Sequence, residues 1–212
     1  HGDSTGFGSF YPAAFRVVKP ARLPGSAMNF CSHCGHTVRF AIPEGDDRPR
    51  YLCDECGTVH YQNPRIVAGT LAVSGSRVLL CRRAIAPRLG YWTLPAGFME
   101  NAETTGEAAA RETREEACAE VALQGLYAMI SLPHINQVFM IFRAELAGAF
   151  APGPESLEVA LFEEEEIPWE ELAFPTIERT LRHFYRDRRA GTCTLHISAI
   201  TPEDRERYFG SA

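Results

Sequence analysis

The sequence predicts an α/β protein that carries a small cysteine-rich module ahead of its main domain. Two observations predict the α/β class: apolar, β-branched runs bounded by turn residues, such as 66–73 and 78–82, and an alanine-rich helical stretch that begins near Thr104. A third observation, two C-x-x-C pairs within residues 31–56, predicts the separate module. A chain of 212 residues has room for one full core and one such module.

The composition narrows the class of protein. The hydrophobic fraction is 45%, the charged fraction 23% and the formal net charge −6, which is ordinary for a globular protein and does not favour broad electrostatic binding to nucleic acid. No apolar run is long enough to span a bilayer, and no secretory apolar segment is visible. Paired cysteines of this kind suit a reducing compartment, so we expect a cytoplasmic protein.

Three segments are expected along the chain. Residues 1–27 have no hydrophobic period and read as an extension or a cloning remnant with little structure. Residues 28–62 form the cysteine-rich module, and residues 63–212 form the main domain.

The cysteine-rich module has the spacing of a four-cysteine zinc ribbon. The expected ligands of a structural Zn²⁺ are Cys31, Cys34, Cys53 and Cys56. Each pair is followed by a glycine, Gly35 or Gly57, which frees the turn so that backbone N–H groups can point at sulfur. Four thiolates close the coordination sphere, so this zinc is expected to be structural. The alternatives are a redox C-x-x-C and substitution of a ligand by one of the histidines, His33, His36 or His60.

The main domain is expected to begin with two strands, at 66–73 and 78–82, joined by the turn 74–76. A loop with Arg83 and Arg88 then leads to Trp92. Strands are also expected at 121–130, 137–146 and 157–162, and a helix from Pro175 or Thr176 whose apolar side covers a sheet. Residues 192–200 are expected to add a strand or a tail whose position in the fold the sequence does not define.

The central helix carries the most informative pattern. Thr104 and Glu107 form a capping-box pattern at its start. Glu112, Glu115 and Glu116 follow at spacings of three and four residues, which places three carboxylates on one helical face. Like charges at these spacings repel, so they indicate a bound hard cation such as Mg²⁺. The alternative is a solvated acidic face.

The flanks of this helix resemble the Nudix hydrolase signature. Its fixed positions are filled, in order and spacing, by Gly97, Glu103, Arg111, Glu112, Glu115 and Glu116. Two positions depart from the family pattern: Thr113 stands where an aliphatic residue is usual, and Cys118 where glycine is frequent. The resemblance implies an α/β/α sandwich with a mixed sheet, and the Cys118 departure leaves the exit of the helix open.

The resemblance also implies roles for these residues. The carbonyl of Gly97 and the carboxylates of the three glutamates would hold catalytic Mg²⁺ or Mn²⁺. Arg111 and Glu103 would pair and hold a catalytic carboxylate in place. A further carboxylate from outside the signature is expected from Glu158, with Glu155 as second choice, and the general base is either a signature glutamate or Glu158.

Substrate contacts are less defined by the sequence. Arg83 and Arg88 are candidates for holding phosphates, against the alternative of solvated loop arginines. Trp92 is most simply a core aromatic, with base stacking as the alternative.

The combination of ribbon and signature resembles the zinc-ribbon branch that includes FAD and ADP-ribose pyrophosphatases. This resemblance implies hydrolysis of FAD or ADP-ribose to AMP and a second phosphate, by an enzyme that is a homodimer. NADH or NAD-capped RNA is the alternative substrate, although the Ser-Gln-Pro-Trp-Pro-Phe-Pro run of NADH pyrophosphatases is missing after the signature. A non-catalytic nucleotide sensor or nucleic-acid-binding regulator is the alternative from another class, and the complete carboxylate set and acidic charge argue against it.

Overall fold

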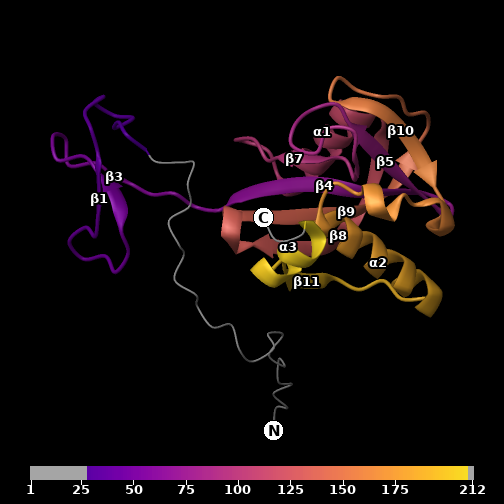
Figure 1. The fold of residues 1–212 in the computed structure, drawn as a ribbon. Helices are drawn as coiled ribbons and strands as arrows, with labels where there is room; N and C mark the ends of the chain where they lie inside the picture. Colours follow the sequence, from indigo (N-terminus) through magenta and orange to yellow (C-terminus); the bar gives the residue numbers. More distant parts are fainter. Residues whose placement is uncertain (1–27, 210–212) are drawn as a thin grey trace, which may run out of the picture.

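The computed structural model describes residues 28–209, apart from the side chains of residues 205, 207 and 209. The extension expected at residues 1–27 lies outside this range. The described chain forms two sheets of different size (Figure 1).

The smaller sheet is antiparallel and belongs to the cysteine-rich module. Its strands are β1 (Arg39–Ala41), β2 (Arg50–Leu52) and β3 (Val59–His60). Each C-x-x-C pair makes the same tight turn: Gly35 N–H donates to the Cys31 carbonyl and Gly57 N–H to the Cys53 carbonyl, both at 2.9 Å. Both glycines have positive φ, 79° and 72°, a conformation that a residue with a Cβ adopts at a cost.

The larger sheet is mixed, in the order β10-β5-β4-β9-β8-β11. Its members are β4 (Arg65–Ser74), β5 (Arg77–Arg83), β6 (Trp92–Thr93), β7 (Ala96–Phe98), β8 (Glu120–Leu132), β9 (Gln137–Ala147), β10 (Ser156–Phe162) and β11 (His196–Ala199). Two short strands lie outside this order: β6 pairs with β5, and β7 pairs with β4. The pairs β4–β9 and β8–β11 are parallel, and the other pairs are antiparallel.

Helices cover both faces of this sheet (Figure 1). α1 (Thr105–Ala117) lies on one face and α2 (Pro175–Ala190) on the other, with α3 (Pro202–Phe209) near the C-terminal end of the described chain. The remaining turns are 3₁₀: η1 (Pro133–Ile135), η2 (Glu164–Glu166) and η3 (Trp169–Glu171).

The central strand β4 shows why the two faces differ. Leu71 and Val73 point into the large core cluster that contains Leu181 of α2. Ala68, three residues before Leu71 and on the other face, packs against Ala108 of α1. Side chains alternate across a strand, so small residues on one face let α1 approach closely while larger ones fill the space below α2.

The expected fold class, an α/β sandwich with a mixed sheet behind a four-cysteine module, is confirmed. Residues 192–200, which the sequence left without a place, supply β11, a parallel edge strand beside β8. None of the helices in the described range is long and apolar enough to cross a membrane.

Candidate active site

The helix α1 is held at both ends. At its start, the Thr104 hydroxyl accepts from Glu107 N–H at 3.2 Å and the Glu107 carboxylate accepts from Thr104 N–H at 2.8 Å, as the capping-box pattern predicts. At its end, the loop after β9 covers the last carbonyls, with Gly153 N–H donating to the Glu116 carbonyl at 3.0 Å. A Cβ at position 153 would overlap the Glu115 carbonyl, so this close approach requires glycine.

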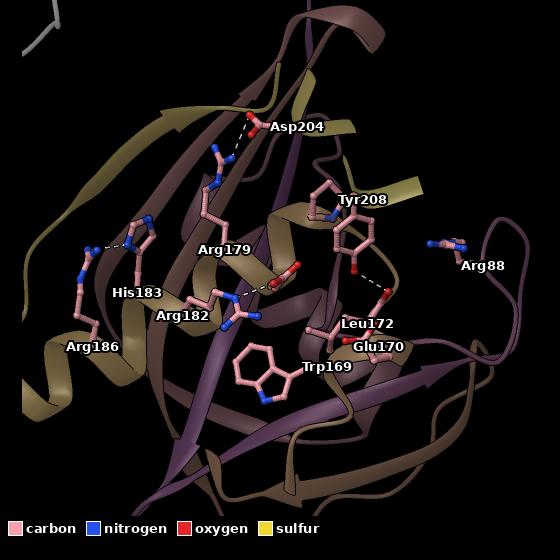
Figure 2. A pocket seen from close by; sticks show the side chains of 12 residues that line it. Arg88, Trp169, Glu170, Leu172, Arg179, Arg182, His183, Arg186, Asp204 and Tyr208 are labelled. Carbon is pink, nitrogen blue, oxygen red and sulfur yellow. Dashed lines mark hydrogen bonds and ion pairs between the residues drawn. The ribbon is translucent and has the colours of Figure 1, made fainter. Parts of the chain in front are cut away.

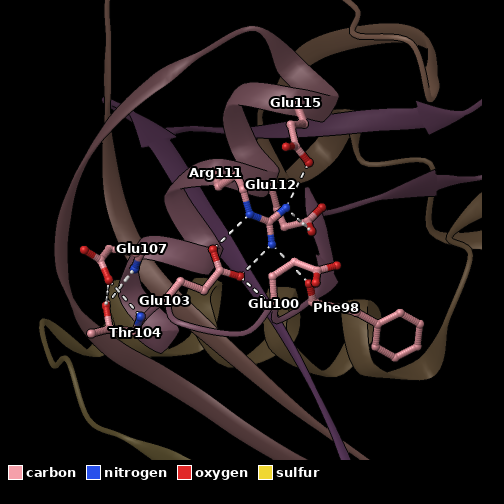
Figure 3. Close-up of polar contacts among 8 residues, drawn as sticks. All are labelled: Phe98, Glu100, Glu103, Thr104, Glu107, Arg111, Glu112 and Glu115. Atoms are coloured by element: carbon pink, nitrogen blue, oxygen red, sulfur yellow. Dashed lines mark hydrogen bonds and ion pairs between the residues drawn. The ribbon is translucent and has the colours of Figure 1, made fainter.

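Arg111 is the centre of the polar network on the helix (Figure 3). Its guanidinium donates to both oxygens of Glu103, at 3.0 and 2.8 Å, and this bond lowers the pKa of Glu103 to about 2. The same guanidinium reaches Glu112 at 2.7 Å, Glu115 at 2.9 Å and the Phe98 carbonyl at 3.1 Å. One planar donor group therefore orients two signature carboxylates while Glu103 holds it in place.

Glu112 and Glu116 point toward the sheet and are buried, with relative exposures of 8% and 7%, whereas the Glu115 side chain is 58% exposed. Burial, together with the neighbouring Glu112 charge and against a lowering by Arg83, raises the pKa of Glu116 to about 8. Burial also raises the pKa of Glu112, although the bond to Arg111 opposes this effect. When both are ionised, Glu112 and Glu116 therefore carry more negative charge in this buried space than Arg111 and Arg83 neutralise.

Gly97 lies on β7, paired with Ala68 of β4 and directly beside the Glu112 carboxylate. A Cβ at position 97 would overlap that carboxylate. The glycine of the signature therefore lets the Glu112 carboxylate pack against the strand backbone, and a side chain at position 97 would require that carboxylate to move.

The two candidates for an outside carboxylate lie differently. Glu155, at the end of the loop before β10, is close enough for its charge to raise the pKa of both Glu112 and Glu116. Glu158, on β10, faces Arg82 at 3.7 Å with a side chain 55% exposed. The structure thus groups Glu155, the second choice from sequence, with the signature carboxylates.

Trp92 lies in the core. The residue is 7% exposed, and its ring packs edge-on against Phe162, with ring centroids 4.9 Å apart, in the core cluster under α2. This burial favours the core role over the base-stacking alternative.

The two loop arginines, Arg83 and Arg88, lie in different surroundings. The positive charge of Arg83 lowers the pKa of Glu116, and the Arg83 guanidinium carbon lies 5.3 Å from the Phe174 ring centroid. Arg88 donates to the Ala173 carbonyl at 3.1 Å and lines a cavity of about 610 Å³ between α2, η3 and α3 (Figure 2). No signature glutamate lines that cavity, so Arg83 is the arginine that belongs with the carboxylates.

Phe98 is a candidate substrate contact that the sequence motifs do not mark. Its ring is 43% exposed, lies next to Gly97 in the chain and carries the Arg65 guanidinium 4.5 Å from its centroid. In Figure 3 the ring points away from the Arg111 network. A large aromatic directly after the signature glycine was the available signal, and only its exposure in the fold marks it as a candidate contact.

The chemistry of the donor set suits a hard divalent cation, although the four cysteines are the metal-ligand group that the described range brings together and the three glutamates do not form a closed cage. Oxygen ligands from Glu112, Glu115 and Glu116 are what Mg²⁺ or Mn²⁺ prefers, and burial raises the pKa of Glu112 and Glu116. A cation bound there would remove the electrostatic cost that the apo arrangement carries.

The four cysteines of the module fit zinc. Their Sγ atoms all lie within 4.8 Å of one another, with Cys31–Cys56 at 3.7 Å and Cys34–Cys53 at 3.4 Å. A tetrahedral site with Zn–S bonds of 2.3 Å has S–S separations of about 3.8 Å, so the arrangement is close to a ligand cage. His60 Nε2 lies 3.2 Å from Cys31 Sγ, which makes this histidine a neighbour of the thiolate rather than a fifth ligand.

Comparison with known proteins agrees with this geometry. A family profile described as Nudix N-terminal, a zinc ribbon, matches residues 29–62, and the NUDIX domain profile matches residues 63–187. A crystal structure of a NUDIX hydrolase from Nitrosomonas europaea is 54% identical, with a TM-score of 0.79, and covers 82% of this chain and 99% of its own.

Curated relatives carry more specific names. The NAD-capped RNA hydrolase NudC of Stutzerimonas stutzeri is 32% identical over 192 residues, covering 85% of this chain and 65% of the relative. The human protein NAD(P)H pyrophosphatase NUDT13, mitochondrial, is 30% identical over 143 residues, covering 68% of this chain and 38% of the relative. The chain therefore spans between about a third and two thirds of the length of these relatives.

The capped helix, its arginine-centred carboxylates, the four-cysteine cage and the profile matches lead to one conclusion: this chain belongs to the Nudix hydrolase family and carries the family's N-terminal zinc ribbon.

Proposed function

We propose that this protein hydrolyses the diphosphate of an ADP-linked substrate and releases AMP. The observation that carries the proposal is the buried pair Glu112 and Glu116, whose pKa values are raised beside the charge of Glu155. A cluster of carboxylates that lacks compensating charge suits a reaction in which a divalent cation and an anionic diphosphate enter together.

The residues that would hold Mg²⁺ or Mn²⁺ are Glu112, Glu115 and Glu116, with the Gly97 carbonyl as partner. When bound, such a cation neutralises diphosphate oxygens and lowers the pKa of a coordinated water. The contribution of the chain is orientation: Arg111 fixes Glu112 and Glu115, and Glu103 fixes Arg111. Arg83, beside Glu116, is positioned to hold a phosphate oxygen, and the exposed Phe98 ring to stack on a base or a nicotinamide.

Within this substrate class, the named relatives favour a nicotinamide dinucleotide, either free NAD(H) or the NAD cap of an RNA. FAD and ADP-ribose, the substrates expected from the sequence resemblance, receive no specific support from these relatives. The missing Ser-Gln-Pro-Trp-Pro-Phe-Pro run counts against the nicotinamide assignment. The substrate therefore needs a direct comparison.

The deciding experiment incubates the protein with Mg²⁺ and equal concentrations of NADH, NAD-capped RNA, FAD, ADP-ribose and diadenosine polyphosphates, and measures AMP or the 5′-monophosphate end of the RNA. We expect the highest kcat/KM with a nicotinamide dinucleotide. A clear preference for FAD or ADP-ribose would restore the resemblance-based assignment, and inertness toward every compound would overturn the proposed activity.

The glutamate roles are tested with a matched control. Glu115→Gln and Glu116→Gln should lower turnover by roughly 10²–10⁴, the range for loss of an acid–base or metal-binding group. Glu120→Gln is the control, because Glu120 is exposed on β8 and paired with Arg114. Turnover of the Glu115 and Glu116 variants within a few-fold of the control, with Mg²⁺ in excess, would contradict these roles.

The outside carboxylate is tested in the same assay. We propose that Glu155 assists the signature glutamates, because its charge acts on both buried carboxylates. Glu155→Gln should then reduce kcat more than Glu158→Gln does. The reverse order would return the role to Glu158, the residue that the sequence resemblance put first.

We also propose a homodimer, by family resemblance, and a cytoplasmic location. Light scattering of the purified chain tests the dimer.

Nucleic acid is a partner at the active site if capped RNA is the substrate. This role differs from that of the non-catalytic regulator considered above. Tight binding of uncapped RNA without turnover would favour that regulator.

A further inference from the structure

The strand β9 carries an arginine on the face of the sheet that α2 covers. Arg143 is in register with Leu71 of β4 and Gly125 of β8. Its guanidinium carbon lies 5.8 Å from the ring centroid of Phe184, a residue of α2, and its Nε atom is buried. The side chain therefore sits between the sheet and α2, on the opposite side of the sheet from α1 and its glutamates.

This guanidinium has no anionic partner in the described part of the chain. Its Nε finds no acceptor there, and no carboxylate forms an ion pair with it. Asp187 shares its surroundings, but Asp187 Oδ2 already accepts from the Tyr127 hydroxyl at 2.9 Å and faces His196 Nε2 at 2.7 Å. A partly buried cation without a counter-charge destabilises a fold, so an anion from outside the chain would be favoured beside it.

Arg143 faces a cavity large enough for such an anion. The cavity has a volume of about 350 Å³. It is lined by Gly75, Tyr127, Arg143, Phe184, Asp187, Arg188, Gly191, Thr192 and Cys193. Two of these side chains are permanently cationic and one is anionic, so the lining carries excess positive charge although the whole chain has a net charge of −6. None of the signature residues contributes to it.

We propose that this cavity binds a small phosphate-bearing anion. A guanidinium offers only donors, in a fork that matches two oxygens of a phosphate, and the Thr192 hydroxyl supplies a further polar group at the wall. The volume lies near the lower end of the range for ligand sites, which suits orthophosphate or a phosphomonoester better than a dinucleotide. The cavity is thus a second anion site, separate from the glutamate cluster and independent of the activity proposed above.

The test is binding of inorganic phosphate and of AMP to the full chain without added divalent metal, by calorimetry and thermal unfolding, against chloride at equal ionic strength. The wild-type protein should show a saturable rise in unfolding temperature with at least one of the two probes. Arg143→Met should unfold at the same or a higher temperature without the probe, because an uncompensated charge is removed, and should bind at least tenfold more weakly. Arg143→Lys keeps the charge but not the fork, and should lie between them.

Two further variants separate this site from others. Arg189→Met removes a charge from the exposed side of α2, where Arg189 pairs with Glu164, and should bind like wild type. Arg83→Met alters the proposed substrate site, where AMP would bind as the product, and should leave orthophosphate binding and the Arg143-dependent part of AMP binding unchanged. A response to orthophosphate supports a free-phosphate site, and a response to AMP alone supports a phosphomonoester site. Absence of saturable binding by either probe, or equal binding by Arg143→Met, would overturn the proposal.

Discussion

At the scale of single residues, Glu116 has the most unusual electrostatics of the site. Burial against the sheet and the neighbouring charge of Glu112 raise its pKa to about 8, far above the ordinary value of 4.5. Between these two values the folded protein holds a proton that the unfolded chain has released. The metal-free protein must therefore lose stability as pH rises from about 5 to 8, because ionising the buried carboxyl favours unfolding.

The loss of stability with rising pH leads to a measurable difference between wild type and a Glu116 variant. Thermal unfolding of the metal-free protein should shift to lower temperature from pH 5.5 to 8.5, and Glu116→Gln should remove part of that slope because glutamine does not titrate. Excess Mg²⁺ should also reduce the slope by stabilising the ionised form. Parallel pH profiles for wild type and Glu116→Gln would mean that Glu116 titrates normally in the folded chain.

The helix exit is a second residue-scale feature. Cys118 adopts the left-handed conformation, with φ 46°, at the position where the family often has glycine. The helix therefore ends in the left-handed cap that glycine would favour, with cysteine in its place. For a residue with a Cβ this conformation costs about 1–2 kcal/mol.

Cys118→Gly should therefore stabilise the protein. Relief of the strain is partly offset by the larger entropy of glycine in the unfolded chain, which leaves a net gain of about 0.5–1 kcal/mol. Urea unfolding measures it, with Cys193→Gly as a control at an exposed cysteine outside any helix. A Cys118→Gly variant less stable than wild type would show that its thiol contact, 3.8 Å from the Pro152 carbonyl, outweighs the strain.

At the scale of elements, the docking of α1 depends on a polar contact in an otherwise apolar interface. The hydroxyls of Thr113 on α1 and Thr70 on β4 lie 2.7 Å apart, and both residues are fully buried. Thr113 gives its proton to the Ala109 carbonyl at 2.8 Å, so Thr70 must be the donor of the pair. The departure at position 113, where the family usually has an aliphatic residue, is thus matched by a partner on the sheet.

A double-mutant cycle tests this pairing. Thr113→Val alone leaves the Thr70 hydroxyl without an acceptor and should cost about 1–3 kcal/mol of unfolding free energy. The double variant Thr70→Val with Thr113→Val replaces both hydroxyls by methyl groups and should cost less than the sum of the single changes. Additive effects would show that the two hydroxyls do not interact energetically.

At the scale of the whole molecule, the two sheets are stabilised in different ways. The large sheet has core clusters on both faces, whereas Cys31 and Cys53 are the buried residues of the described part of the zinc ribbon. A module without its own apolar core depends on its metal for folding free energy.

Removal of zinc should therefore unfold residues 29–62 and leave the Nudix domain folded. Hydrogen exchange after treatment with a zinc chelator should show loss of protection in β1 to β3, with protection retained in β4 and β9. Cys53→Ser should reproduce this pattern without a chelator. Loss of protection throughout the chain would mean that the ribbon and the larger domain fold as one cooperative unit.

Much of this protein follows from local sequence. The capping box at Thr104, the glycines after each C-x-x-C pair and the spacing of the glutamates all act within a few residues, so the start of α1, the two metal-binding turns and the shared helical face could be predicted from sequence. The signature predicted the pairing of Arg111 with Glu103 by resemblance, and the structure has this pair.

Other features depended on contacts between distant segments. The loop before β10 approaches the end of α1, which places Glu155 near the buried carboxylates, while the register of β10 on β5 sets Glu158 against Arg82. The pleat of β6 turns Trp92 into the core, and that of β9 turns Arg143 under α2. Sequence alone determined which residues could bind a metal; the tertiary structure decided which charges are left without a partner, because burial and strand register are properties of the packed chain.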